Sequence, residues 1–305
     1  MYKKILVPLD GSQLSEGVLP YARFFAKQLK IPVELLQVIE PETVSTFSDP
    51  AHGHYVDAVE AGMKASSLDY LEPVAGSFPD PSAVDCSVEI GKPAEVIVDK
   101  ALAQAGALVA MATHGRSGLR RWLLGSVAEK VLRATNNHLL LVRPAGRNGA
   151  SGLARLVKVL VALDGSPLAE RVLPPVAVLS RKMDMEVVLL QAYTLPQVAY
   201  VADDYAPNMD QIAQQTREEA KSYLEEKVEQ LQAEGLRRVS YVLLDGDAAG
   251  EIIDIARRTP DNLVAMCTHG RSGIGRWVLG SVTERVVRHS GDPVLVVRAT
   301  ATGLD

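Results

Sequence analysis

The chain has 305 residues, of which 47% are hydrophobic and 23% charged, and its formal net charge is −5. One hydrophobic core rarely grows to this length, so two domains of roughly 150 residues each are expected. The negative charge argues against a protein that binds nucleic acid through a basic face. No apolar run approaches the roughly 18 residues of a membrane span and no signal peptide is recognised, which predicts a cytoplasmic protein without a membrane partner.

In chain order, the first half predicts an alternation of strands and helices. Helices are expected at Gln13–Leu29, Tyr55–Val74, Ala94–Ala105 and Ser126–Ala134. Because the strand candidates are apolar on consecutive residues, they suit strands that are covered on both faces. The alternation predicts a doubly wound parallel sheet with right-handed crossovers. The five strand candidates are centred on Leu6, Leu35, Val88, Val109 and Leu140.

The second half repeats the first in the same order. MATHGRSGLRRWLLGSV, residues 111–127, returns as MCTHGRSGIGRWVLGSV, residues 266–282, with thirteen of seventeen positions identical. ILVPLDGS, PVELLQVIEP and NHLLLVRPA also have counterparts, in VLVALDGS, EVVLLQAYTLP and DPVLVVRAT. The chain is therefore a tandem duplication. We expect domains at 1–145 and 156–300 and a Gly/Ala/Ser-rich linker at 146–155.

Two glycines of the repeated motif suggest a phosphate site. Gly115 directly follows the fourth predicted strand, and Gly125-Ser126 begins the next helix. Glycine tolerates positive φ and close approach of a ligand, and the N–H groups at a helix start attract anions. Ligands of doubly wound sheets bind outside the carboxyl ends of the strands. The motif is neither a Walker A loop nor a GxGxxG fingerprint.

A strand ending in THG, nine further residues and Gly-Ser-Val, together with an N-terminal ILVPLDGS strand, resembles the universal stress protein family. The resemblance covers both halves, and the family pattern G-x2-G-x9-G-[ST] is matched twice except at its first glycine, here Ala112 and Cys267. It implies a Rossmann-like α/β fold of the adenine nucleotide alpha-hydrolase-like type. Two tandem five-stranded parallel sheets would then be paired about a pseudo-twofold axis.

The resemblance also implies an adenine nucleotide site in each half. Adenine and ribose are expected at Pro8, Asp10 and Val38, with Ala162, Asp164 and Ala192 as counterparts. The phosphates are expected at Gly115, Gly125, Ser126 and Val127, and at Gly270, Gly280, Ser281 and Val282. Ala112, His114, Cys267 and His269 complete the candidate nucleotide-binding set.

Structural interpretations stand beside these assignments. Ser126 with Glu129, and Ser281 with Glu284, fit the capping box S-x-x-E. Asp10 and Asp164 fit Asx turns, and the two motif histidines fit loop-ordering roles better than catalysis. Five arginines fit bidentate phosphate donors and solvated charges equally well: Arg116, Arg120, Arg121, Arg271 and Arg276. The remaining candidates have packing or loop interpretations: Gly115 and Gly270 as turn residues; Trp122 and Trp277 as loop anchors; and His52 and His54 as loop residues rather than metal ligands.

The favoured function is a stress-response regulator that binds ATP or a related adenine nucleotide in one or both modules, with Mg²⁺ on the phosphates, and changes its contacts with protein partners. No general base, nucleophile or metal cluster is evident, so an enzyme is not predicted, and slow ATP hydrolysis stays open. The alternative is a scaffold without nucleotide, which the Ala112 and Cys267 departures favour and the intact Gly-Ser pairs oppose. By the resemblance, Leu139–Val142 and Val294–Val297 would pair antiparallel within the chain; homodimerisation stays open.

Overall fold

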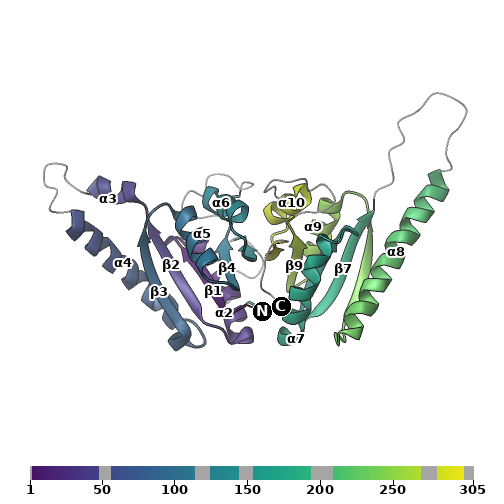
Figure 1. The fold of residues 1–305 in the computed structure, drawn as a ribbon, viewed down its shortest axis with the longest axis horizontal. Helices are drawn as coiled ribbons and strands as arrows, with labels where there is room; N and C mark the ends of the chain where they lie inside the picture. Colours follow the sequence, from purple (N-terminus) through teal and green to yellow (C-terminus); the bar gives the residue numbers. More distant parts are fainter. Residues whose placement is uncertain are drawn as a thin grey trace, which may run out of the picture.

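The computed structural model describes residues 2–47, 56–113, 124–143, 154–193, 209–268 and 280–298. Within these ranges, strands and helices alternate in both halves of the chain (Figure 1). Module 1 contains β1 (Lys4–Leu9), α1 (Gln13–Glu16), α2 (Leu19–Leu29), β2 (Val33–Ile39), α3 (Pro41–Phe47), α4 (Val56–Gly76), β3 (Val84–Ile90), α5 (Pro93–Ala103), β4 (Ala107–Ala112), α6 (Ser126–Ala134) and β5 (Leu139–Val142). Module 2 contains β6 (Lys158–Leu163), α7 (Leu173–Met183), β7 (Glu186–Tyr193), α8 (Met209–Ala233), β8 (Val239–Asp245), α9 (Ala248–Arg258), β9 (Asn262–Cys267), α10 (Ser281–His289) and β10 (Val294–Val297).

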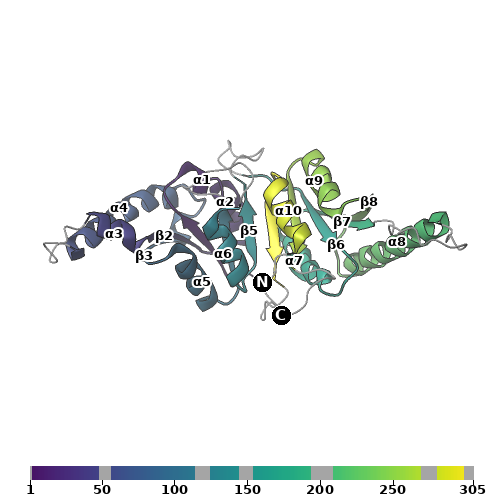
Figure 2. The same cartoon turned by 90° about the horizontal axis from the view of Figure 1, so that it is seen from above.

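The ten strands form one continuous sheet in the order β3-β2-β1-β4-β5-β10-β9-β6-β7-β8. Within each module all neighbouring strands are parallel, as the doubly wound pattern predicts. The modules meet where β5 pairs antiparallel with β10, with Leu140 opposite Leu295 (Figure 2). The two five-stranded sheets are therefore joined edge to edge, and β3 and β8 form the outer edges.

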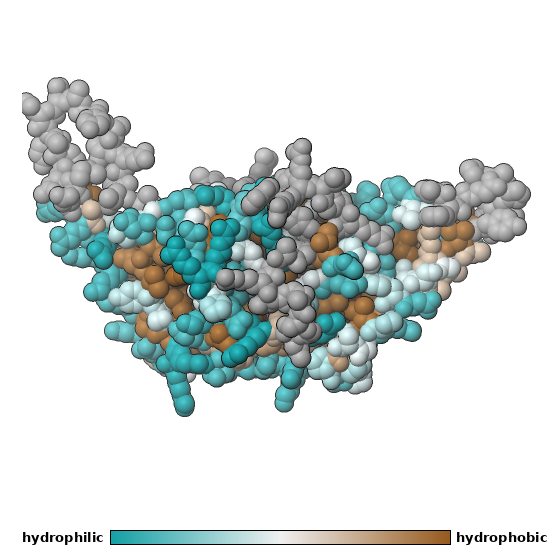
Figure 3. Space-filling model, turned by 180° about the vertical axis from the view of Figure 1, so that it is seen from behind, coloured by the Kyte–Doolittle hydropathy of each residue, from teal (hydrophilic) through white to brown (hydrophobic). Residues whose placement is uncertain are grey.

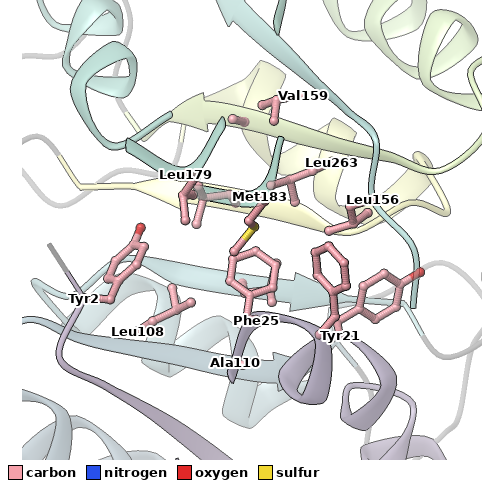
Figure 4. Packing of buried hydrophobic residues seen from close by; sticks show 14 of the residues in the cluster. Tyr2, Tyr21, Phe25, Leu108, Ala110, Leu156, Val159, Leu179, Met183 and Leu263 are labelled. Atoms are coloured by element: carbon pink, nitrogen blue, oxygen red, sulfur yellow. The ribbon is translucent and has the colours of Figure 1, made fainter. Parts of the chain in front are cut away.

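Helices cover both faces of this sheet. One core cluster packs against α2, α4, α7 and α8, and it includes buried residues from both modules. In Figure 4, Met183 of α7 points toward the ring of Phe25 of α2, so side chains of the two modules interdigitate beneath the junction. A second cluster lies on the opposite face, against α5, α6, α9 and α10. The strands are covered on both sides, which explains their continuous apolar sequences.

Two equivalent arginines cross the junction in opposite directions. Arg143, after β5, donates to the carbonyl oxygen of Arg288 in α10 at 2.7 Å. Arg298, after β10, donates to the carbonyl oxygens of Thr135 and Arg133 at 2.8 and 3.0 Å, at the end of α6. The last carbonyls of a helix have no partner in its own ladder, and a cation there also interacts favourably with the helix dipole. Each module thus caps the last helix of the other.

The helices of module 1 differ from the prediction in two places. The segment predicted as one helix from Gln13 to Leu29 is divided into α1 and α2. Pro20 lies in the first turn of α2, where a missing N–H costs little, so the proline begins a new helix rather than continuing α1. Helix α3, which begins at Pro41, was not predicted, because its seven residues are too few to show the apolar periodicity that distinguishes a helix from a loop.

A buried carboxylate, Glu34 of β2, marks an internal difference between the modules. Its side chain is 7% exposed and lies 2.9 Å from the ammonium groups of Lys4 and Lys100. It also accepts hydrogen bonds from Ser87 Oγ at 2.9 Å and Gln104 Nε2 at 3.0 Å. These hydrogen bonds outweigh the effect of burial and lower the pKa of Glu34 to about 2, so the carboxylate is ionised at neutral pH.

Module 2 places apolar residues at the positions equivalent to Glu34, Ser87, Glu89 and Lys100. Leu6 faces Glu34 in the β1–β2 register and Leu160 faces Val188 in the β6–β7 register. The same comparison matches Ser87 with Val242, Glu89 with Leu244 and Lys100 with Ile255; all three apolar partners pack in the second core cluster, as does Val188. At these four positions, module 1 has charged or polar side chains and module 2 has hydrocarbon, whereas Lys4 and Gln104 correspond to Lys158 and Thr259.

Among the described residues, no helix has the combination of length and apolar sequence that a membrane crossing requires. On the face seen in Figure 3, hydrophilic residues separate the hydrophobic ones into patches.

Candidate functional site

The turn after the first strand of each module has the same geometry. Asp10 Oδ1 accepts hydrogen bonds from Ser12 N at 3.0 Å and Ser12 Oγ at 2.6 Å. Gly11 has a φ of 78° and Gly165 one of 79°, a conformation that favours glycine. Asp164 and Ser166 repeat the two hydrogen bonds at 2.9 and 2.6 Å. The Asx-turn interpretation of both aspartates is therefore confirmed, and a role in ligand binding stays a prediction.

The start of α6 is held against the carboxyl end of β4. Gly125 N donates to the carbonyl oxygen of Thr113 at 2.7 Å, and Thr113 N donates to Val142 O at 2.8 Å. In module 2, Gly280 N donates to Thr268 O at 2.9 Å and Thr268 N to Val297 O at 3.1 Å. The buried threonines of the two THG motifs thus fix the helix starts beside the sheet edge where ligands of doubly wound folds bind.

This geometry corrects two expectations about the glycines. Gly125 and Gly280 have φ values of −60° and −58°, so positive φ does not explain the glycine at either position. The amide of each is also already used by the preceding threonine carbonyl. A Cβ on Gly280 would lie 3.3 Å from Thr268 O. The close approach of the Thr268 backbone therefore explains the glycine at this position better than positive φ does.

The capping-box expectation is wrong in both modules. Gly125 and Gly280 themselves are the N-cap residues, and no side chain of the described residues caps either helix. Ser126 and Ser281 lie one position too late and are exposed. The first ladder bonds come from Glu129 N to Gly125 O and from Glu284 N to Gly280 O, both at 2.9 Å. The amides of the three residues from Ser126, and of the three from Ser281, precede these ladder bonds and point out of the helix start.

The predicted adenine-side residues lie on the same face of the sheet as these helix starts. In β1 and β2, Leu6 and Leu36 belong to the cluster against α5 and α6, and alternation places Pro8 and Val38 on that side. Val38 and Val127 both pack against this cluster. The counterparts in module 2 behave alike: Ala162 belongs to the cluster, and Ala192 and Val282 pack against it.

The two departures from the family pattern are buried at the ends of β4 and β9. Ala112 is 6% exposed and Cys267 7%. The carbonyl oxygen of Cys267 accepts a hydrogen bond from Thr283 Oγ1 at 3.1 Å, and the equivalent position in α6 is Ala128. The second helix start is therefore tied to its strand by a side-chain bond that Ala128 cannot make in module 1. Sequence analysis missed this threonine, as well as the roles of Thr113 and Thr268.

A profile of the universal stress protein family matches residues 1–143 and 157–298. The chain belongs to this family. Two matches in one chain also make it a tandem universal stress protein, as the internal repeat indicates.

Similar proteins share this organisation or half of it. A universal stress protein from Mycolicibacterium smegmatis is 25% identical over 301 residues, covering 96% of both chains. Universal stress protein MJ0531 from Methanocaldococcus jannaschii is 33% identical over 146 residues, which are 47% of this chain and 83% of that protein. The crystal structure of a universal stress protein from Archaeoglobus fulgidus superposes over 97% of this chain and 98% of its own, with a TM-score of 0.67 and 22% identity. This last similarity shows the fold.

Several sequence candidates of this universal stress protein lie outside the described residues. They are His114, Gly115, His269 and Gly270, together with His52, His54, Trp122, Trp277 and the arginines at 116, 120, 121, 271 and 276. Within the described part of the chain, no three His, Cys, Asp or Glu side chains are grouped so that they could hold a metal ion.

Proposed function

We propose that this tandem universal stress protein binds ATP, or a related adenine nucleotide, at the carboxyl edge of one or both modules. The observation that carries the proposal is the start of α6, where Gly125 is anchored to Thr113 and, within the part of the chain that the structure describes, no side chain caps the helix. The outward-pointing amides from Ser126 onward suit phosphate oxygens, and the helix dipole adds to that attraction. The family pattern around this helix start, G-x2-G-x9-G-[ST], supports the assignment.

The adenine and ribose would lie over the end of β1 and β2, near Pro8, Asp10 and Val38. Val38 supplies an apolar surface on the same face as Val127, so base and phosphates would occupy neighbouring places on one sheet edge. Mg²⁺ would be carried by the nucleotide phosphates. Binding would change the surface that the protein offers to its partners, in a regulatory rather than an enzymatic role.

Isothermal titration calorimetry with Mg²⁺-ATP tests the proposal. We expect binding to the unchanged chain and loss of one site in Gly125→Val, because a branched side chain would crowd the helix start. Gly280→Val is the matched variant in module 2, where a Cβ would already lie 3.3 Å from Thr268 O. Circular dichroism establishes that each variant is folded. Absence of binding at millimolar ATP would refute the proposal and favour the scaffold, in which the modules act through protein contacts alone.

A further inference from the structure

The helix that follows the third strand begins differently in the two modules. In module 1, α5 has Lys92 as its N-cap residue, with no side-chain cap. In module 2, the equivalent N-cap residue of α9 is Asp247, whose Oδ2 accepts a hydrogen bond from Gly250 N at 2.8 Å. A cation at one helix start thus corresponds to an anion at the other.

Asp247 also reaches the helix whose start is the proposed phosphate site. Its Oδ1 lies 2.9 Å from Arg285 Nη1. Arg285 is the fifth residue of α10, about 6 Å along the helix axis from Ser281. The Gly250 amide and then Arg285 lower the pKa of Asp247, so this carboxylate is charged at neutral pH. A carboxylate that is paired with Arg285 therefore lies near the start of α10.

The net charge at the starts of α5 and α9 differs between the modules. The positions that differ in charge are Lys92, Glu95 and Val96 in module 1, and Asp247, Gly250 and Glu251 in module 2. The first set carries a net charge of 0 and the second −2. The Lys92–Glu95 pair is 3.3 Å long, but both side chains are more than two-thirds exposed, so it leaves the sum unchanged and holds Lys92 only weakly.

We propose that the two modules select nucleotides of different charge. Module 1 takes a nucleoside triphosphate, and module 2 takes an adenine nucleotide with fewer phosphates, such as a monophosphate. Lys92 and Asp247 are the specificity-determining residues. This inference rests on the proposed function and adds to it a different ligand for each half of the chain.

The size of the effect follows from simple electrostatics. In water, one unit charge on the protein about 10 Å from one unit charge on the ligand changes the affinity for that ligand about twofold. ATP carries about two more negative charges than AMP, and the modules differ by two charges at the helix starts, so the ATP-to-AMP affinity ratio should differ about sixteenfold between modules at low salt. Screening at 0.15 M ionic strength, where the Debye length is about 8 Å, should reduce this difference to about twofold.

The experiment measures ATP and AMP affinities of the full chain by calorimetry at low salt and at about 0.15 M salt. Gly280→Val reports the first site, and Gly125→Val the second. Asp247→Asn removes the charge but keeps a good N-cap residue, and we expect it to raise the ATP-to-AMP ratio of module 2 about fourfold at low salt. This variant, made in the otherwise unchanged chain, gives the answer even if a glycine variant does not fold.

Glu229→Gln is the matched control, because it removes one exposed negative charge from α8, away from both helix starts. It should leave both ratios unchanged. Equal ATP-to-AMP ratios in the two modules, or an Asp247→Asn variant that behaves as Glu229→Gln does, would overturn the inference while the proposed function stands. Failure of both nucleotides to bind either module would instead refute the proposed function.

Discussion

Replacing Glu34 by valine should strongly destabilise module 1, because it leaves two lysines beside an apolar side chain. The shift of the Glu34 pKa from 4.5 to about 2 is about 2.5 units, which corresponds to about 3 kcal/mol as an upper bound. The lysine side chains are each 23% exposed and stay partly hydrated, so about 2 kcal/mol is a better expectation. Urea unfolding at pH 7 measures this loss.

The sign of the pH dependence follows from the depressed pKa. Glu34 contributes its full stabilisation above the unfolded-state value of about 4.5, and the contribution is lost as the pH falls toward about 2. The difference in unfolding free energy between the unchanged chain and Glu34→Val should therefore shrink over this range. Unfolding measured at several acid pH values tests the trend.

Module 2 supplies the control. Combining Glu34→Val with Ser87→Val, Glu89→Leu and Lys100→Ile installs the residues that module 2 has at these positions. Replacing a whole buried charge network by hydrocarbon is often neutral, whereas removing one partner is costly. We expect the combined variant to recover most of the stability that Glu34→Val loses. If the single substitution cost nothing, or if its cost stayed constant down to pH 2, the reasoning would be refuted.

Three further predictions concern the junction, a turn and a buried histidine. Arg298→Ala should lower the free energy of unfolding by about 2 kcal/mol, because a buried guanidinium that donates to two carbonyls is lost; Arg298→Lys should recover only part of it, and urea unfolding measures both. Ser12→Ala should cost about 1 kcal/mol by the same assay, since Ser12 Oγ accepts from Ser15 N at the start of α1; Ser82→Ala, on an exposed turn, is the comparison. Burial lowers the pKa of His138 to about 4, so stability should fall as the pH drops from about 6.5 to 4; an NMR titration of His138 with a midpoint near 6.5 would contradict this.

Much of the fold could be predicted because the chain repeats local signals that agree with one another. The five strand centres of module 1 all fall within observed strands, and α6 has the predicted bounds. The errors have local causes. The helix predicted from Gln13 to Leu29 is divided because Pro20 lies in the first turn of a new helix, and α3 is too short for its apolar periodicity to be recognised.

The candidate site was predictable in its location but not in its details. The motif spacing indicated which helix start meets the sheet edge. The spacing could not reveal that Gly125, rather than Ser126, is the N-cap residue. That assignment depends on the hydrogen bond from Gly125 N to Thr113 O, which joins residues 12 positions apart. The Asp247–Arg285 pair was equally hidden, since it joins residues 38 positions apart through the packing of α9 on α10.

The two halves that meet at the antiparallel contact of β5 with β10 belong to one polypeptide, so their sequences can diverge. In an assembly of identical subunits, every substitution appears twice, so a change that suits one subunit is imposed on the other. Here both halves are in one polypeptide, and their encounter is intramolecular at high effective concentration. Natural selection can therefore exchange the residues around Glu34 for hydrocarbon in one half alone, as Val188 and its neighbours illustrate, without losing the partner surface.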